Sequence, residues 1–152
     1  MKLPPLVYNI LLADDDKDDH YFFARALKAL PIPTDLVTVE DGEKLMTYLT
    51  ENSEQLPNVL FLDLNMPRKN GSECLSEIKL NKKFKQLPVI IYSTSLYKEV
   101  ADELYKKGAS YYIRKTGGPL ENLQKILYRA ITLVVEKKIA QPTREEFVLG
   151  AD

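Results

Sequence analysis

The stretch ILLADDDKDDH, residues 10–20, runs an apolar tetrapeptide directly into five aspartates: Asp14, Asp15, Asp16, Asp18 and Asp19. A short apolar run of this length is typical of a strand in the interior of a sheet. Carboxylates held close together repel one another, so a buried strand that ends on several of them needs a compensating positive charge. The end of this strand is therefore a candidate functional site.

Further apolar runs of strand length follow along the chain, and segments with helical spacing of apolar residues separate them. The predicted strands are 6–13, 36–40, 59–62, 89–92 and 111–113, and the predicted helices are 19–30, 42–50, 71–80, 98–107 and 119–138. Alternating strands and helices favour crossovers that pack right-handed onto a parallel sheet covered on both faces. We therefore expect an α/β fold with a five-stranded, doubly wound parallel sheet.

The size and charge of the chain limit the number of domains it can form and the kinds of partner it can bind. Of the 152 residues, 1–140 are expected to form one domain, and the tail 141–152 to be frayed or docked on its own domain or on a partner. The 21 Lys and Arg nearly balance the 22 Asp and Glu, which leaves no basic surface for nucleic acid or anionic lipid. No segment reaches the ~18 apolar residues of a membrane span. The lone Cys74 and the lack of a signal-peptide cleavage site favour a cytoplasmic location.

Polar residues collect directly after the predicted strands. They are Asp14, Asp15 and Asp16 after the first strand, Asp63 after the third, Ser93 and Thr94 after the fourth, and Lys115 after the fifth. In an open parallel sheet, ligands bind outside the carboxyl ends of the strands, near the point where strand order reverses. If the first and third strands are neighbours, Asp14, Asp15 and Asp63 converge, and a hard divalent cation such as Mg²⁺ would relieve their repulsion.

Lys115 and Ser93 add the remaining parts of a site for phosphoryl transfer. A lysine ammonium can pair with an aspartate in an empty site and with a phosphoryl oxygen in a filled one. A serine hydroxyl can donate a hydrogen bond to the same phosphoryl group. Together with a metal and a carboxylate nucleophile, these are the groups that phosphoryl transfer requires.

Four segments, LLADD, FLDLNMP, PVIIYST and GASYYIRK, occur in this order at the predicted strand ends. Over residues 7–136 the chain resembles the receiver domain of two-component response regulators, the CheY-like family, and is similar to the chemotaxis response regulator. The resemblance implies a flavodoxin-like (βα)5 fold with strand order 2-1-3-4-5. The polar link TENSEQLPN and the segment LDLNMPRKNG further resemble the stand-alone receivers associated with bacteriophytochromes.

The resemblance implies roles for the residues of the metal site. Asp63 matches the residue that accepts a phosphoryl group from the phosphohistidine of a histidine kinase. Asp15 matches the carboxylate that binds Mg²⁺ directly, and Asp14 matches the one that acts mainly through water. The backbone carbonyl of Asn65 is expected to be a further metal ligand, with its side chain near the path of the water that hydrolyses the aspartyl phosphate.

The resemblance also implies a set of switch residues. Ser93 matches the switch hydroxyl, with Thr94 as its neighbour, and Tyr112 matches the aromatic that turns inward when that hydroxyl is drawn to the phosphate. Lys115 matches the lysine that binds the phosphoryl group, but the family usually has a cis Lys-Pro bond there, and this chain has Thr116 instead. Because a cis bond before a non-proline residue costs ~2.5–4 kcal/mol, we expect a trans bond. Thr94 and Thr116 remain secondary candidates for the site.

These assignments predict a single-domain response regulator of a phosphorelay, which is a phosphoacceptor and not an enzyme with a separate substrate. We expect it to receive the phosphoryl group from a histidine kinase or a histidine phosphotransfer protein. A DNA-binding module would find no room after the last helix, so a downstream protein is expected to read the face formed by 98–107, 111–113 and 119–138. A homodimer through this face, or through the apolar triplet 147–149 of the tail, is a further expectation.

Two alternative functions stay open. A small phosphatase of the haloacid dehalogenase type also uses a strand-end Asp, a Ser or Thr, a Lys and Mg²⁺. It needs a second Asp two residues after the nucleophile, where this chain has Asn65, and it normally places that pair on the first strand. A receiver that acts as a scaffold without phosphorylation is the other alternative, which Thr116 favours slightly.

Several polar residues of the chain have an ordinary structural explanation. Asp16, Asp18 and Asp19 are expected to start a helix, because its dipole stabilises acids in the first turn. His20 has no second His or Cys at ligand spacing and is expected to be an ordinary helix residue, and Cys74 is expected in the core.

Overall fold

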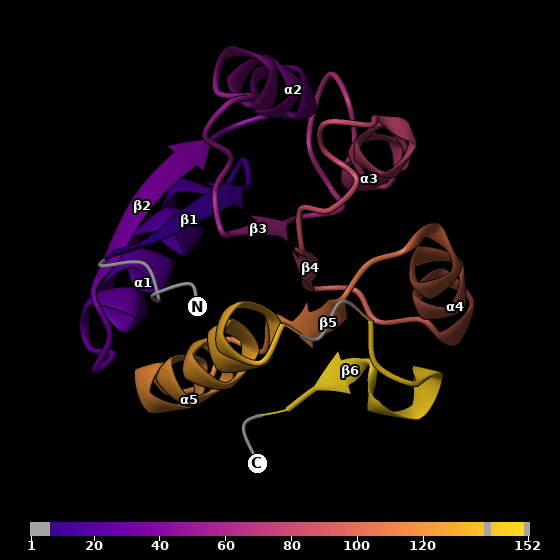
Figure 1. Ribbon diagram of the computed structural model, residues 1–152. Coiled ribbons are helices and arrows are strands. Elements are labelled where there is room, and N and C mark those ends of the chain that lie inside the picture. Colours follow the sequence, from indigo (N-terminus) through magenta and orange to yellow (C-terminus); the bar gives the residue numbers. More distant parts are fainter. Residues whose placement is uncertain (1–6, 139–140, 151–152) are drawn as a thin grey trace.

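A computed structural model describes residues 7–138 and 141–150, and the strands in these ranges form one parallel sheet (Figure 1). The strands are β1 (Tyr8–Ala13), β2 (Thr34–Val39), β3 (Val59–Leu62), β4 (Val89–Ser93), β5 (Tyr111–Arg114) and β6 (Val148–Leu149). Their order in the sheet is β2-β1-β3-β4-β5-β6, which confirms the order 2-1-3-4-5 for the first five. The chain leaves β1 toward one edge and returns beside it as β3, so the carboxyl ends of β1 and β3 form the topological switch point.

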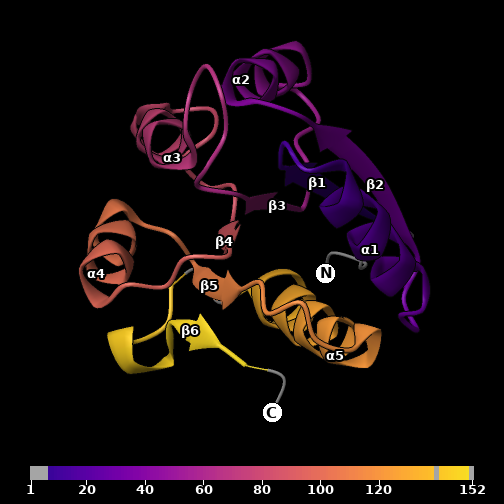
Figure 2. The ribbon, with the colours of Figure 1, turned by 180° about the vertical axis from the view of Figure 1, so that it is seen from behind.

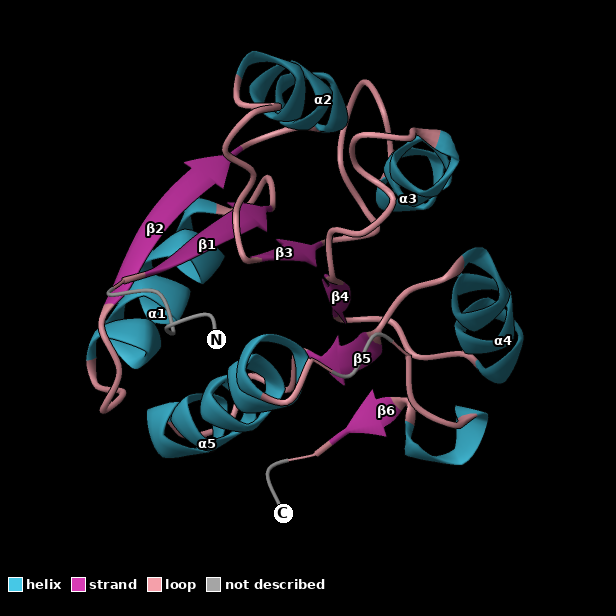
Figure 3. Cartoon of the chain, viewed as in Figure 1, coloured by secondary structure: helices cyan, strands magenta, loops and turns pink. Residues whose placement is uncertain are grey.

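Helices cover both faces of the sheet (Figures 1 and 3). One face carries α1 (Lys17–Lys28) and α5 (Leu120–Ile131), and the other carries α2 (Gly42–Glu51), α3 (Gly71–Leu80) and α4 (Lys98–Lys107). The view from behind shows the same two layers (Figure 2). Both β3 and β4 are buried along their whole length, as their uninterrupted apolar sequences predicted. Among the described residues, no helix is both long and apolar enough to cross a membrane.

Two aspartates begin helices by capping them. The Asp16 side chain accepts a hydrogen bond from the backbone N–H of Asp18 at 2.8 Å, and the Asp41 side chain accepts one from Lys44 at 2.8 Å. Such caps satisfy backbone N–H groups that have no partner within the helix. Because Asp16 supplies the cap, α1 begins at Lys17, two residues before the predicted start at 19.

The sheet has one strand more than predicted, because the tail adds β6 to the edge of β5. Phe147, directly before β6, is fully buried, with its ring 5.2 Å from the Tyr105 ring and 6.3 Å from the Tyr112 ring. The Tyr112 backbone N–H donates to the Phe147 carbonyl at 3.0 Å. Burial of Phe147 and Leu149 therefore docks the tail on the edge of β5, whereas Val148 stays exposed. A strand of two residues is too short for a periodic pattern to reveal.

Three details refine the predictions for the backbone and the core. The α5 helix passes into a π-helical turn, Thr132–Glu136, so the helical segment ends before 138. None of the described peptide bonds is cis, so the bond between Lys115 and Thr116 is trans, as expected. Cys74 is fully buried, as predicted, and this burial raises the pKa of its thiol to about 12.

Candidate functional site

Three carboxylates meet at the carboxyl ends of β1 and β3, where the sequence places them. The parallel register pairs Ala13 with Leu62, so the next residue of each strand leaves the sheet beside the other. Asp14 and Asp63 are buried, Asp15 is exposed, and one oxygen from each lies within 4.8 Å of the others. Hard oxygen donors in this number suit Mg²⁺, which completes its octahedral shell with water and carbonyl oxygens. The donor set therefore fits the predicted cation.

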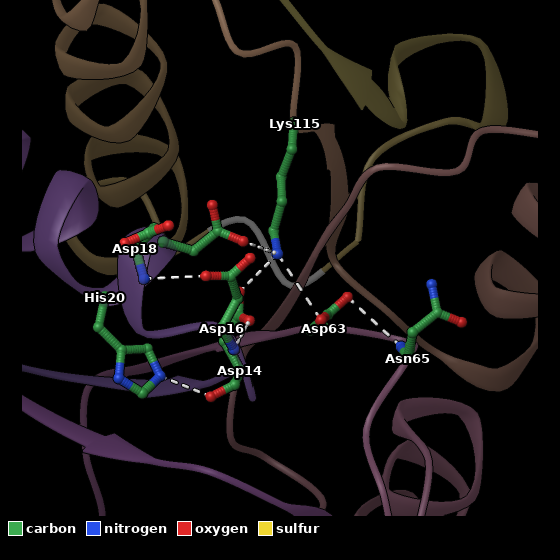
Figure 4. Close-up of polar contacts among 8 residues, drawn as sticks. Asp14, Asp16, Asp18, His20, Asp63, Asn65 and Lys115 are labelled. Atoms are coloured by element: carbon green, nitrogen blue, oxygen red, sulfur yellow. Dashed lines mark hydrogen bonds and ion pairs between the residues drawn. The ribbon is translucent and has the colours of Figure 1, made fainter.

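The loop between β3 and α3 shapes the other side of this cluster. The backbone N–H of Asn65 points toward Asp63 Oδ1 at 3.4 Å (Figure 4). A cleft of about 630 Å³, lined by Asp15 and Asn65, extends toward α4. Gly71, the first residue of α3, packs so tightly against the Asp63 backbone carbonyl that a Cβ there would collide with it. The start of α3 thus fixes the backbone that carries Asp63.

Lys115 supplies the positive charge of the site. Its Nζ lies 2.5 Å from Asp14 Oδ2, 2.8 Å from an oxygen of Asp19 and 3.6 Å from Asp63 Oδ2. Figure 4 shows the side chain reaching down between Asp14 and Asp63. Burial alone would lower the pKa of Lys115, but hydrogen bonds to Asp14 and Asp19 raise it above its ordinary value. The lysine is therefore a permanent cation, and it is the compensating charge that the acidic end of β1 requires.

Burial controls the ionisation of the acidic cluster. It raises the pKa of Asp63 to about 6, an effect that the nearby Lys115 opposes and the charge of Asp14 reinforces. Burial also raises the pKa of Asp14, although Lys115 acts against it. A bound divalent cation favours the ionised form of a carboxylate, so these two groups gain from a metal.

The candidate switch residues divide into buried and exposed ones. Ser93 is fully buried, and its hydroxyl has no hydrogen-bond partner of ordinary geometry in the described ranges, although its proximity lowers the pKa of Asp63. Tyr112 is also fully buried and donates its hydroxyl hydrogen bond to the Ser95 carbonyl. Thr94 and Thr116 are exposed and lie outside the buried part of the site. A group bound on Asp63 would give the Ser93 hydroxyl the acceptor it lacks.

The sequence did not reveal the contacts of one acid and one histidine. Asp19 lies in the first turn of α1, as predicted, but it is also half-buried and bonded to Lys115. His20 donates from Nε2 to the Asp14 carbonyl at 2.5 Å and so ties α1 to the end of β1. The available signal was spacing, because Asp19 precedes the fully buried Phe23 by four residues and therefore shares its face of α1.

Comparison with known proteins finds relatives of this chain in both sequence and structure. A family model described as the response regulator receiver domain matches residues 10–127. Response regulator Rcp1 of Synechocystis sp. is 35% identical over 117 residues, which cover 74% of this chain and 78% of Rcp1. The crystal structure of Mn²⁺-bound Rcp1 aligns with a TM-score of 0.74 at 31% identity, covering 91% of this chain and 100% of that one. The phosphorylated cyanobacterial phytochrome response regulator RcpA gives a TM-score of 0.74 at 31% identity, covering 90% and 99%.

Proposed function

Because this chain belongs to the response regulator receiver domain family, we propose that it is a single-domain response regulator that accepts a phosphoryl group on Asp63. The donor in the cell would be the phosphohistidine of a histidine kinase or of a histidine phosphotransfer protein. The observation that carries the proposal is the environment of Asp63, a buried carboxylate with a lysine cation 3.6 Å away and two further acids close by. A bound metal, the lysine cation and the nucleophile would thereby share one site.

Each side chain of the site would have its own role in the transfer. Asp63 supplies the carboxylate oxygen that forms the new P–O bond, while the P–N bond to the donor histidine breaks and its imidazole leaves. Lys115 offsets the charge of the transferred group, and Ser93 can donate a hydrogen bond to one of its oxygens. Asp15 and Asp63 would hold Mg²⁺ directly, with the Asn65 carbonyl as a further ligand and Asp14 acting through water. When bound, the metal would neutralise the charge on the oxygens of the transferred group.

Tyr112 links this chemistry to the output face formed by α4, β5 and α5. The tail covers part of that face, because β6 pairs with β5 (Figures 1 and 2). The Phe147 ring also packs against the rings of Tyr105 and Tyr112. Arg144 of the tail also donates to Asp102 of α4 at 2.7 Å. A downstream protein, or a second copy of the chain, would therefore contact the tail together with α4 and α5.

The two alternative functions fit this site less well. A haloacid dehalogenase-type phosphatase needs a carboxylate where Asn65 stands, and its nucleophile normally lies on the first strand, whereas Asp63 follows β3. Thr116 gave the scaffold alternative slight support, yet the bond before Thr116 is trans and Lys115 still reaches the acidic cluster. We therefore expect a phosphoacceptor without a separate substrate. The cytoplasmic location stays a prediction.

Acetyl phosphate is a suitable small donor for the test. Intact-mass spectrometry of the wild-type chain should show one added phosphoryl group with Mg²⁺ and none with excess chelator. Asp63→Asn should show none in either condition, and size exclusion of the same samples would report any dimer. Phosphorylation of Asp63→Asn at the wild-type rate would contradict the proposal.

A further inference from the structure

Asp19 is the one acid in this site that the proposed reaction leaves without a role. Its carboxylate accepts a hydrogen bond from Lys115 Nζ at 2.8 Å, and its side chain is 27% exposed. The neighbouring Asp18 lies on the same helical turn and is fully on the surface. A half-buried carboxylate bonded to the reactive lysine has a different environment from an acid that only favours the helix dipole.

The fold holds Asp19 on a rigid support. Phe23, one turn later on the same face of α1, packs its ring 5.0 Å from Phe61 and 5.6 Å from Tyr92. The hydrogen bond from His20 to the Asp14 carbonyl fixes the first turn of the helix to the end of β1. These contacts determine where the Asp19 carboxylate lies, because the helix that carries it is anchored at both of these points.

Lys115, by contrast, has a long side chain and is followed by an exposed loop. Thr116 and the glycines after it are exposed, and Gly117 has a φ of 65° with open space around it. The ammonium has three N–H donors, of which Asp14 takes one and Asp19 takes another. Asp63, at 3.6 Å, is too distant for a hydrogen bond. Among the residues that the structure describes, Asp19 therefore accepts one of the two hydrogen bonds that the ammonium donates.

We propose that Asp19 is a positioning residue, which keeps the Lys115 ammonium within reach of Asp63 when Asp14 turns to the metal. This inference rests on the proposed function of the site. Engagement of Asp14 in the metal site weakens its hydrogen bond to the ammonium. The bond to Asp19 stays, and it leaves the other N–H donors free for an oxygen of the incoming phosphoryl group.

The first test observes the pair without any chemistry. The Nζ signal of Lys115 in nitrogen-detected or proton–nitrogen NMR reports how well its protons are protected from exchange. The metal-free wild type and the matched control Asp18→Asn should both show a protected Lys115 ammonium. Asp19→Asn should lose the signal through fast exchange. Asp19→Glu should restore it, because a cavity of about 220 Å³ beside Asp19 and Lys115 leaves room for one more methylene.

The second test asks whether Asp19 acts through Lys115 in the reaction. The rate of phosphorylation by acetyl phosphate at saturating Mg²⁺ should fall about tenfold in Asp19→Asn, the order expected when one charge-assisted hydrogen bond is lost. It should stay unchanged in Asp18→Asn and recover largely in Asp19→Glu. In a Lys115→Met background, Asp19→Asn should have no further effect, since two residues that act as one unit are not additive.

The outcomes separate the two proposals. If the wild type takes up no phosphoryl group, the proposed function fails, while the ammonium signal still decides whether Asp19 holds Lys115. A rate for Asp19→Asn equal to or faster than wild type would overturn the positioning role. An equal loss of rate with and without Lys115 would also overturn it, because Asp19 would then act only through the total charge of the site.

Discussion

The substitution Asp63→Asn is expected to stabilise the metal-free protein at neutral pH. Burial raises the pKa of this carboxyl from 3.8 to about 6, so between these two values the folded state binds more protons than the unfolded state. The free energy of unfolding of the wild type therefore falls as pH rises from about 4 to about 6 and levels off above that. An Asn side chain does not ionise in this pH range, so the variant does not lose this stability.

The size of the effect follows from the shift. At 1.36 kcal/mol per pKa unit, the wild type loses about 3 kcal/mol by pH 7.5, and roughly half of this is already lost at pH 5. Asp63→Asn should therefore exceed the wild type in unfolding free energy by about 3 kcal/mol at pH 7.5 and by about half as much at pH 5. The side chain is only 7% exposed, so solvent screening leaves most of the effect in place.

Urea unfolding in the presence of chelator, monitored by circular dichroism, measures the difference in unfolding free energy at both pH values. Added Mg²⁺ should narrow the gap at pH 7.5, because it binds the folded wild type and stabilises it by mass action. If Asp63→Asn were no more stable than the wild type at pH 7.5, or if the difference did not widen with pH, burial would not be the force that sets the pKa of Asp63.

Two further predictions concern the frame of the site and the tail. Gly71→Ala should lower the unfolding free energy by about 1–3 kcal/mol, because the added Cβ would collide with the Asp63 carbonyl. The control is Gly150→Ala, where an added Cβ contacts no other atom. Equal urea midpoints for the two variants would contradict the explanation. Phe147→Ala should release the tail, because that ring is its fully buried anchor against Tyr112. Hydrogen exchange should then speed up at Tyr112, whose backbone N–H pairs with the tail, and unchanged exchange there would show that β6 stays docked without the ring.

The buried strands and the acids at their ends were readable from the sequence because each carries a local signal. An uninterrupted apolar run marks a strand covered on both faces, and a polar residue directly after it falls at the carboxyl edge of the sheet, as at Asp63. Strand β6 has two residues and docks through Phe147, so its formation depends on the open edge of β5 and not on any periodicity of its own. The partnership of Asp19 with Lys115 joins residues 96 positions apart, and only the packing of α1 on the sheet brings them together.

The location of the phosphoryl group tests the central claim most directly. The wild-type chain would be treated with acetyl phosphate and Mg²⁺, reduced with borohydride to convert an aspartyl phosphate into homoserine, digested and sequenced by tandem mass spectrometry. We expect homoserine at position 63 and unchanged aspartate at positions 14, 15 and 19. Homoserine at one of these other positions, or at none, would contradict the claim.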